Sequence, residues 1–346
     1  MNNVTTIFGN DTRPCDTEPP TDSDLIPQKF IDCGLIYFSP SQLKQPLHYW
    51  LTDRFLLDPE TKKKKKQSVP ARFGSAIHKM VQDSYILGED LKQILIDIES
   101  ELKTRTKNYD NKDFYKVAEY KKKLFPVYEN VVDAFEILKI EKCDLETPID
   151  LSLRGVDIPI NGYTDFRTDT HVIELKTKWN RVREVSERYN VYRVLKNGQW
   201  SKSKRVFKDH DEVDEYVAEQ DCDTKVEFID KHFECDSPPI VKEPYKNDLL
   251  QLALYSKATG LKPVIVYATE KDFKIFNQDN CELLSQESLD NYVEKARRIA
   301  LSRQNLIKMV DDPHQLIDVI EPPDISEFWY DLGQDVVNEV KHIWNL

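Results

Sequence analysis

The sequence has little of what marks several protein classes. Only nine of its 346 residues are glycine, which excludes collagen-like repeats and glycine-rich linkers. No run of about 18 apolar residues occurs, so no membrane-spanning helix or membrane partner is expected. Residues 1–21 lack the basic-then-apolar pattern of a secretory leader. The six cysteines contain no Cys-x-x-Cys pair, which argues against a zinc ribbon or iron–sulfur cluster and favours reduced thiols in the cytoplasm (the host cytoplasm for a viral protein).

Positive net charge is also missing. Lys and Arg number 49 against 61 Asp and Glu, which gives a net charge of −12. Any contact with nucleic acid must therefore depend on local basic patches or on metal ions. Hydrophobic residues make up 40% of the chain, enough for a substantial core, and the length suggests two domains or one domain with large insertions.

The two ends of the chain differ from its middle. Residues 1–30 are rich in Asn, Thr, Asp and Pro, which predicts a flexible arm. Residues 31–140 predict a helical region, with a helix start at Ser39-Pro40 and helices near 73–87, 90–106 and 112–138. Lysines occupy positions 62–66, and this run predicts a loop that is either solvated or in contact with phosphate. Residues 284–346 again predict a helical region.

The middle of the chain, residues 141–283, predicts strands and one helix. Residues 146–178 alternate with turn signals between the runs, which indicates a three-stranded antiparallel meander. A helix is expected over 246–259, ending at Gly260, with strands at 264–269 and 273–276. Residues 179–243 interrupt this pattern as an insertion, in which Asn197-Gly198 predicts a β-hairpin. The fold class predicted is α/β.

Acidic and basic side chains meet within the predicted meander. Asp165 lies on one strand, and Glu174 and Lys176 share one face of the next, with Leu175 pointing to the core. Adjacent carboxylates repel each other, and a hard cation such as Mg²⁺ or Mn²⁺ removes that repulsion. A lysine beside the metal can orient or deprotonate a water or stabilise an oxyanion, as phosphodiester hydrolysis requires. The ordinary alternative is a surface Glu–Lys ion pair.

Two helical motifs add to this group. Gly74-Ser-Ala-Ile-His78 can supply an imidazole ligand to the same metal, although a lone helix histidine is more often packed in a core. Gln251 and Tyr255 stand four residues apart on one helix face, where an amide and a phenol can bind a phosphate or hold the lysine. The alternative is the polar edge of an amphipathic helix.

The order Gly-x-x-x-His, Gly-x-x-Asp, Glu-x-Lys, Gln-x-x-x-Tyr resembles the PD-(D/E)XK nuclease superfamily. The resemblance is narrower to its RecB-type exonucleases, which include the mitochondrial genome maintenance exonuclease and the CRISPR adaptation nucleases. The matching segments are residues 72–80, 160–178 and 249–263, and residues 37–43 resemble the Ser-x-Ser-x-Leu opening of this branch. The resemblance implies a restriction-endonuclease-like core, a mixed central sheet flanked by helices, with helical additions at both ends and an inserted hairpin.

The resemblance also implies a role for each matching position. His78, Asp165, Glu174 and the backbone carbonyl of Leu175 would bind Mg²⁺ or Mn²⁺, and Lys176 would be the catalytic lysine. Gln251 and Tyr255 would position that lysine or the DNA. The chain departs from the branch because it lacks the cysteines of the iron–sulfur cluster found in several members, so no cluster is expected. It also lacks a Gly-x-x-x-x-Gly-Lys-Ser/Thr loop, so a helicase motor would have to come from a partner.

The predicted insertion carries a local positive charge. Residues 178–208 contain ten Lys or Arg and two acidic residues, with aromatic residues at 179, 189, 192, 200 and 207. Such a hairpin can follow a phosphate backbone and stack unpaired bases, whereas the alternative is a solvated hairpin whose aromatics pack on the body. The candidate DNA contacts are Arg181, Arg183, Tyr192, Arg193, Lys196, Trp200, Lys202, Lys204 and Arg205.

These observations lead to one expectation and two alternatives. We expect a Mg²⁺- or Mn²⁺-dependent DNA nuclease, an exonuclease acting on single-stranded DNA or single-stranded ends in recombination, repair or replication. The exonuclease assignment and the possible helicase or recombination partner follow from the resemblance. The alternatives are a catalytically silent DNA-binding or assembly subunit on the same fold, and an endonuclease of the same superfamily.

Overall fold

The computed structural model describes residues 26–65, 67–105, 111–325 and 333–346. The chain folds into two compact units, which are described separately: residues 1–95, 126–178 and 240–346 form the first, and residues 96–125 and 179–239 the second. The predicted flexible arm falls outside the described residues up to position 25. The described end of it is packed, because Phe30 in α1 (Gln28–Asp32) is fully buried.

The first unit contains a mixed five-stranded sheet, so the α/β class predicted from the sequence is confirmed. Its strands are β1 (Asp144–Leu151), β2 (Ile160–Arg167), β3 (His171–Thr177), β7 (Lys262–Ala268) and β8 (Phe273–Phe276), in the order β1-β2-β3-β7-β8. The strands β1, β2 and β3 form the predicted antiparallel meander, β3 and β7 are parallel, and β8 is antiparallel to β7. Residues 153–159, expected to be strand in part, instead connect β1 to β2.

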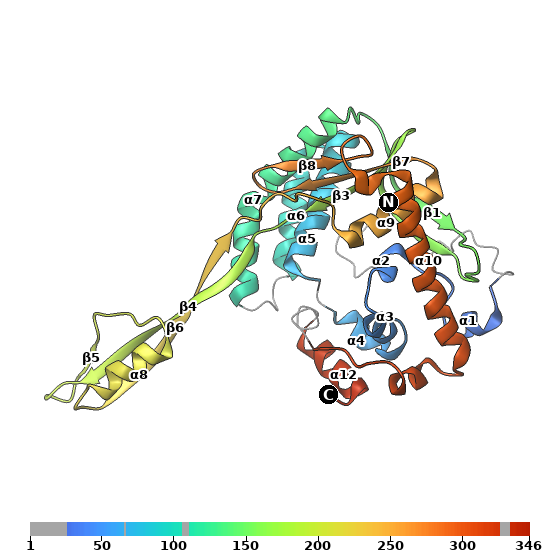
Figure 1. Cartoon of the computed structure of the whole chain (residues 1–346). Helices are drawn as coiled ribbons and strands as arrows, with labels where there is room; N and C mark the ends of the chain where they lie inside the picture. Colours follow the sequence, from blue (N-terminus) through green and yellow to red (C-terminus); the bar gives the residue numbers. More distant parts are fainter. Residues whose placement is uncertain (1–25, 66, 106–110, 326–332) are drawn as a thin grey trace, which may run out of the picture. The chain divides into compact units, whose positions relative to one another are not determined.

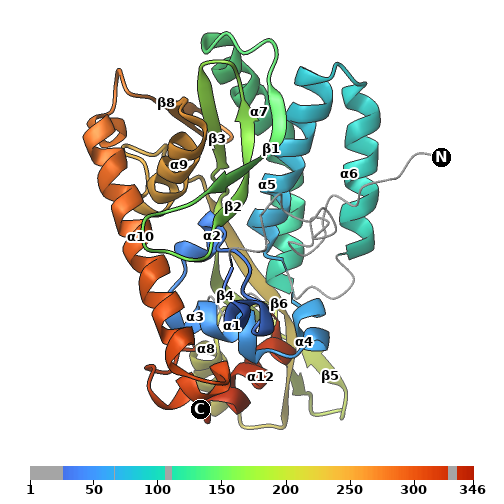
Figure 2. The ribbon, with the colours of Figure 1, turned by 90° about the vertical axis from the view of Figure 1, so that its right-hand side faces the viewer.

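Helices cover both faces of this sheet (Figures 1 and 2). On one face, α9 (Lys246–Thr259) packs its leucines against β3 and β7, next to the start of α10 (Gln286–Met309). It ends at Gly260, whose φ of 70° is the left-handed cap predicted there. The other face holds α5 (Val69–Met80) and the part of α7 (Asn111–Ile137) from Pro126, where Phe135 contacts Phe166 of β2 edge to face.

A second core joins the two ends of the chain. Helices α2 (Pro40–Leu43), α3 (Leu47–Leu51) and α4 (Pro59–Lys63) lie with α10 and α12 (Gln334–Trp344). Buried Phe30, Trp50 and Trp344 belong to this cluster. The indole of Trp344 donates to Thr52 Oγ1 at 2.9 Å, which joins the C-terminal helix to the π-helical turn Thr52–Leu56.

The lysine run at 62–66, expected to be a loop, begins inside a helix and leaves it at Lys64. Lys62 and Lys63 form the last turn of α4, whose Asp58 cap fixes the helix start. The Lys62 ammonium donates to the carbonyl of Arg54, and Lys65 forms an ion pair with Asp53. These lysines cap and pair locally because carbonyls and a carboxylate lie within reach of their flexible side chains. Lys66 lies outside the described residues.

The helix expected near 73–87 begins earlier and changes geometry. Ser68 caps α5 and Pro70 occupies its first turn, so the helix starts at Val69. From Val81 the backbone continues as a π-helical turn, Val81–Ile86. The next two expected helices are α6 (Leu91–Arg105) and α7.

The second unit is built on a long two-stranded ribbon. Strand β4 (Arg181–Val194) pairs antiparallel with β6 (Thr224–Asp236) along most of its length, and the short β5 (Trp200–Lys202) pairs with the end of β4. The Asn197-Gly198 hairpin is therefore confirmed, although its second strand is shorter than expected and β6 is the main partner. Helix α8 (His210–Ala218) contributes Val213 to a small core that also holds Tyr189, Val191 and Phe207. Within the described ranges, no helix is long and apolar enough to cross a membrane.

Candidate functional site

The predicted carboxylates meet where β2 and β3 separate. The pairing of the two strands is Phe166 with Ile173 and Arg167 with Val172, so the same register places Asp165 opposite Glu174. Beyond this point the amide of Leu175 donates to Asp165 Oδ2 at 3.0 Å. The Asp165 side chain thus accepts the hydrogen bond of a β3 backbone amide, and its carboxylate is held beside Leu175.

The side chain of His78, on α5, lies beside Asp165 and Leu175. Its Nε2 lies 3.1 Å from the carbonyl oxygen of Leu175, and its Nδ1 lies 3.9 Å from Asp165 Oδ1. One turn earlier, a Cβ on Gly74 would lie 3.2 Å from Thr177 Oγ1. The glycine of the Gly-x-x-x-His motif therefore allows α5 to lie close to the end of β3, which brings His78 to Asp165 and Leu175.

Glu174 is the most deeply buried of these groups. Its side chain is 0% exposed, Oε1 bonds the ammonium of Lys176, and Oε2 is buried without a hydrogen-bond partner. Burial, and then the neighbouring Asp165 carboxylate, raise the pKa of Glu174 to about 7. Burial alone would lower the pKa of Lys176, but Glu174 and Asp165 outweigh it and the pKa is raised. Both pKa values are raised, so each of the two groups binds its proton more tightly than it would in water.

The Gln251–Tyr255 motif faces inward and is not the polar edge of an amphipathic helix. Both side chains are buried, and Gln251 Nε2 donates to Tyr255 Oη at 2.8 Å. The amide oxygen of Gln251 accepts from the ammonium of Lys44, directly after α2. The motif was predicted to bind a phosphate or to hold Lys176. It does hold a lysine, but that lysine is Lys44. The ammonium of Lys176 bonds Glu174 instead.

Sequence reasoning did not select Lys44 or Asp248. Lys44 lies near the site because α2 packs closely on β2 at Gly162. A Cβ at that position would lie only 2.9 Å from Pro40 Cδ, so glycine is needed for this approach. No local pattern around Lys44 pointed to the site, since only the tertiary contact places it there. Asp248 lies on α9 one turn before Gln251, and the helical period alone would have placed it on the same face.

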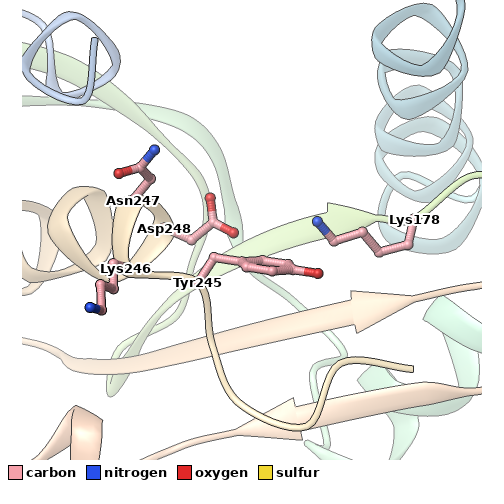
Figure 3. A pocket seen from close by; sticks show the side chains of 5 residues that line it. All are labelled: Lys178, Tyr245, Lys246, Asn247 and Asp248. Carbon is pink, nitrogen blue, oxygen red and sulfur yellow. The ribbon is translucent and has the colours of Figure 1, made fainter. Parts of the chain in front are cut away.

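An open depression lies beside this group at the start of α9 (Figure 3). Figure 3 shows Lys178 and Asp248 pointing into it from opposite sides of the Tyr245 ring, whereas Lys246 points away. The Lys178 ammonium lies 3.9 Å from the centre of that ring. Tyr267 donates to Asp248 Oδ2 at 2.7 Å and accepts from the amide of Tyr245 at 3.1 Å, which fixes the carboxylate.

The candidate DNA contacts all lie in the second unit, but they differ in availability. Arg183 pairs with Glu234 and Asp236, Arg205 with Glu212, and Tyr192 donates to Glu227. The other candidates are exposed, and they are Arg181, Arg193, Lys196, Trp200, Lys202 and Lys204. Two of the interleaved aromatic residues, Tyr189 and Phe207, are buried in the small core and cannot stack on bases. For these two residues the alternative interpretation, in which the aromatics are packed, is correct.

The residues at the end of β3 fit a hard divalent cation. They offer two carboxylates, an imidazole and a main-chain carbonyl, a donor set typical of Mn²⁺ or Mg²⁺. His78 Nε2 donates to the Leu175 carbonyl at 3.1 Å, and a cation bound by both atoms would replace this hydrogen bond. The unpartnered Glu174 oxygen lacks only a positive partner. Across the described parts of the chain, no group of three or more His, Cys, Asp or Glu side chains is already arranged as a metal site, so Glu174 would have to turn from Lys176.

The sequence matches no protein-family model and no curated protein.

Proposed function

We propose that the protein is a Mg²⁺- or Mn²⁺-dependent nuclease that hydrolyses phosphodiester bonds in DNA. The observation that carries the proposal is the contact of His78 with Asp165 and the Leu175 carbonyl, beside the buried Glu174–Lys176 pair, from segments nearly 100 residues apart in sequence. An ordinary surface ion pair does not account for a fully buried Glu174 with one oxygen unpartnered. The order of the motifs supports the same interpretation.

The chain supplies binding groups and a fixed positive charge. His78, Asp165, Glu174 and the Leu175 carbonyl would hold the cation, which supplies activation of a water and neutralisation of phosphate charge. Lys176 lies beside two carboxylates that raise its pKa, so it acts as a cation and not as a base. In the hydrolysis a bond would form from the water oxygen to phosphorus as the bond to the leaving oxygen breaks. The proton lost by the water would pass through solvent to the leaving oxygen, and Lys176 would stabilise the negative charge that develops.

The second unit supports DNA as the substrate. Its exposed cations include Arg193, Lys196, Lys202 and Lys204, and they flank Trp200, whose side chain is 52% exposed. An exposed indole among cations suits unpaired bases and their phosphates. We therefore place single-stranded DNA, or a single-stranded end, on this hairpin, with a role in recombination, repair or replication. An exonuclease mode follows from the motif resemblance alone.

The test compares linear and circular single-stranded DNA with Mn²⁺ or with EDTA. We expect the wild type to degrade the linear form with Mn²⁺ only, and Lys176→Ala to lose cleavage while it keeps DNA binding. Lys257→Ala, on the exposed side of α9, is the matched control and should cleave normally. Thermal melting checks that each variant is folded.

Each alternative gives a different result. Cleavage of the circle would indicate an endonuclease. Full-length DNA with retained binding would indicate a silent binding or assembly subunit, and undiminished cleavage by Lys176→Ala would remove this site from the reaction.

A further inference from the structure

Lys44 is an unusual lysine because it is half-buried and points at the candidate nuclease site. Its ammonium donates to Gln251 Oε1, which is itself ordered by the bond from Gln251 Nε2 to Tyr255 Oη. Lys176, Glu174, Asp248 and Asp165 all act on its charge, so it lies beside both the carboxylates and the second lysine. Burial, and then the charge of Lys176, lower the pKa of Lys44.

The ammonium of Lys44 uses one of its donors on the protein itself. An ammonium has three donors, and within the described ranges only Gln251 accepts from Lys44. Lys176, whose charge acts on Lys44, is already bonded to Glu174. A half-buried cation with unused donors, held in place by a buried amide, is suited to an anion that arrives with the substrate.

We propose that Lys44 binds a non-bridging oxygen of a backbone phosphate in the bound strand. The inference rests on the proposed nuclease function and adds a substrate contact to it. The two lysines then have separate tasks: Lys176, from which Glu174 turns towards the cation, stabilises the developing charge, and Lys44 binds the incoming phosphate. Gln251 and Tyr255 are positioning residues that act through Lys44.

The structure gives a reason for this separation. If Lys176 left Glu174, a buried carboxylate would lose its positive partner, which is costly unless another cation takes that place. Lys44 gives up nothing comparable, since its partner is a neutral amide. An incoming phosphate therefore meets Lys44 as a donor that is free to bind it.

The test uses Lys44→Met, which keeps the length of the side chain and removes its charge, with Lys257→Met as the matched control. Binding of a short single-stranded oligonucleotide is measured by fluorescence anisotropy in Ca²⁺ over a range of salt, and cleavage is measured in Mn²⁺. We expect Lys44→Met to weaken binding about tenfold or more, as loss of a charge-assisted hydrogen bond would. The slope of log affinity against log salt should become shallower by about 0.7, which is one phosphate contact.

A methylphosphonate scan of the oligonucleotide identifies the phosphate. One position should bind the wild type at least tenfold more weakly than unmodified DNA, and that penalty should fall below about threefold in Lys44→Met. If Lys44→Met does not fold, the test uses Lys44→Gln, which removes the charge and keeps a hydrogen-bond donor for Gln251. Gln251→Leu should show a smaller loss of the same kind.

The outcomes separate this inference from the proposed function. A wild type that cleaves DNA while Lys44→Met keeps the salt slope and affinity of Lys257→Met would overturn the inference and leave the nuclease proposal intact. A wild type that neither binds nor cleaves DNA would overturn both.

Discussion

The buried carboxylate of Glu174 makes the stability of the first unit depend on pH in a predictable direction. Its pKa is raised from 4.5 to about 7 in the folded protein, mainly by burial. Because the pKa is raised on folding, the contribution of Glu174 to the free energy of unfolding is fully present below the pKa of the unfolded state. It is lost as pH rises through the pKa of the folded state. Between pH 5 and pH 8, without divalent metal, ionisation of Glu174 should cost the folded state about 2 kcal/mol.

The variant Glu174→Gln isolates this cost, because an amide of the same shape does not ionise. In EDTA, the wild type should lose on the order of 5 °C in melting temperature between pH 5 and pH 8 through this group. Glu174→Gln should show a flatter profile, and Glu287→Gln, in the exposed first turn of α10, should follow the wild type. Differential scanning calorimetry measures all three.

Metal addition completes the experiment. At pH 8, Mn²⁺ should raise the melting temperature of the wild type, since ligand binding to the folded state stabilises it, and should do much less for Glu174→Gln. Parallel pH profiles for wild type and Glu174→Gln would refute the claim that burial of this carboxylate controls the site. A Mn²⁺ response of equal size in both proteins would refute its part in metal binding.

Three further predictions concern packing. Gly162→Ala places a Cβ 2.9 Å from Pro40 Cδ, so it should destabilise the protein by about 1–3 kcal/mol, which thermal melting would detect and an unchanged melting temperature would contradict. Trp344→Phe removes the buried bond from the indole to Thr52 and should cost about 1 kcal/mol in urea unfolding, and an unaltered midpoint would mean the bond contributes nothing. Phe207→Ala empties the small core of the second unit, at a cost of about 3–5 kcal/mol there, so trypsin should cut its exposed lysines faster, and equal cutting rates would speak against that core.

Local signals in the sequence were sufficient for the antiparallel meander and for helix α9, whereas the parallel pairing of β3 with β7 was not predicted from them. The α9 helix carries its own stop signal in Gly260, and the meander carries a turn signal between each pair of strands. The pairing of β4 with β6 was out of reach, because more than 30 residues separate the paired positions at the start of β6 and no turn joins them directly. The inward direction of Gln251 was missed for a related reason, since α9 is apolar around most of its surface and its sequence does not show which side faces the sheet.

The glycines of the motifs explain why their order predicted a meeting of side chains. In Gly-x-x-x-His and in Gly-x-x-Asp, the glycine is the residue at which another element approaches most closely: Thr177 lies 3.2 Å from the place of a Cβ at Gly74, and Pro40 lies 2.9 Å from that at Gly162. Each motif therefore joins a close backbone contact to a polar side chain a few residues later. The contact at Gly162 also brings Lys44 to the site, and nothing in the sequence around Lys44 marks it. Because such a residue depends on another element's packing, it can be found only in the structure.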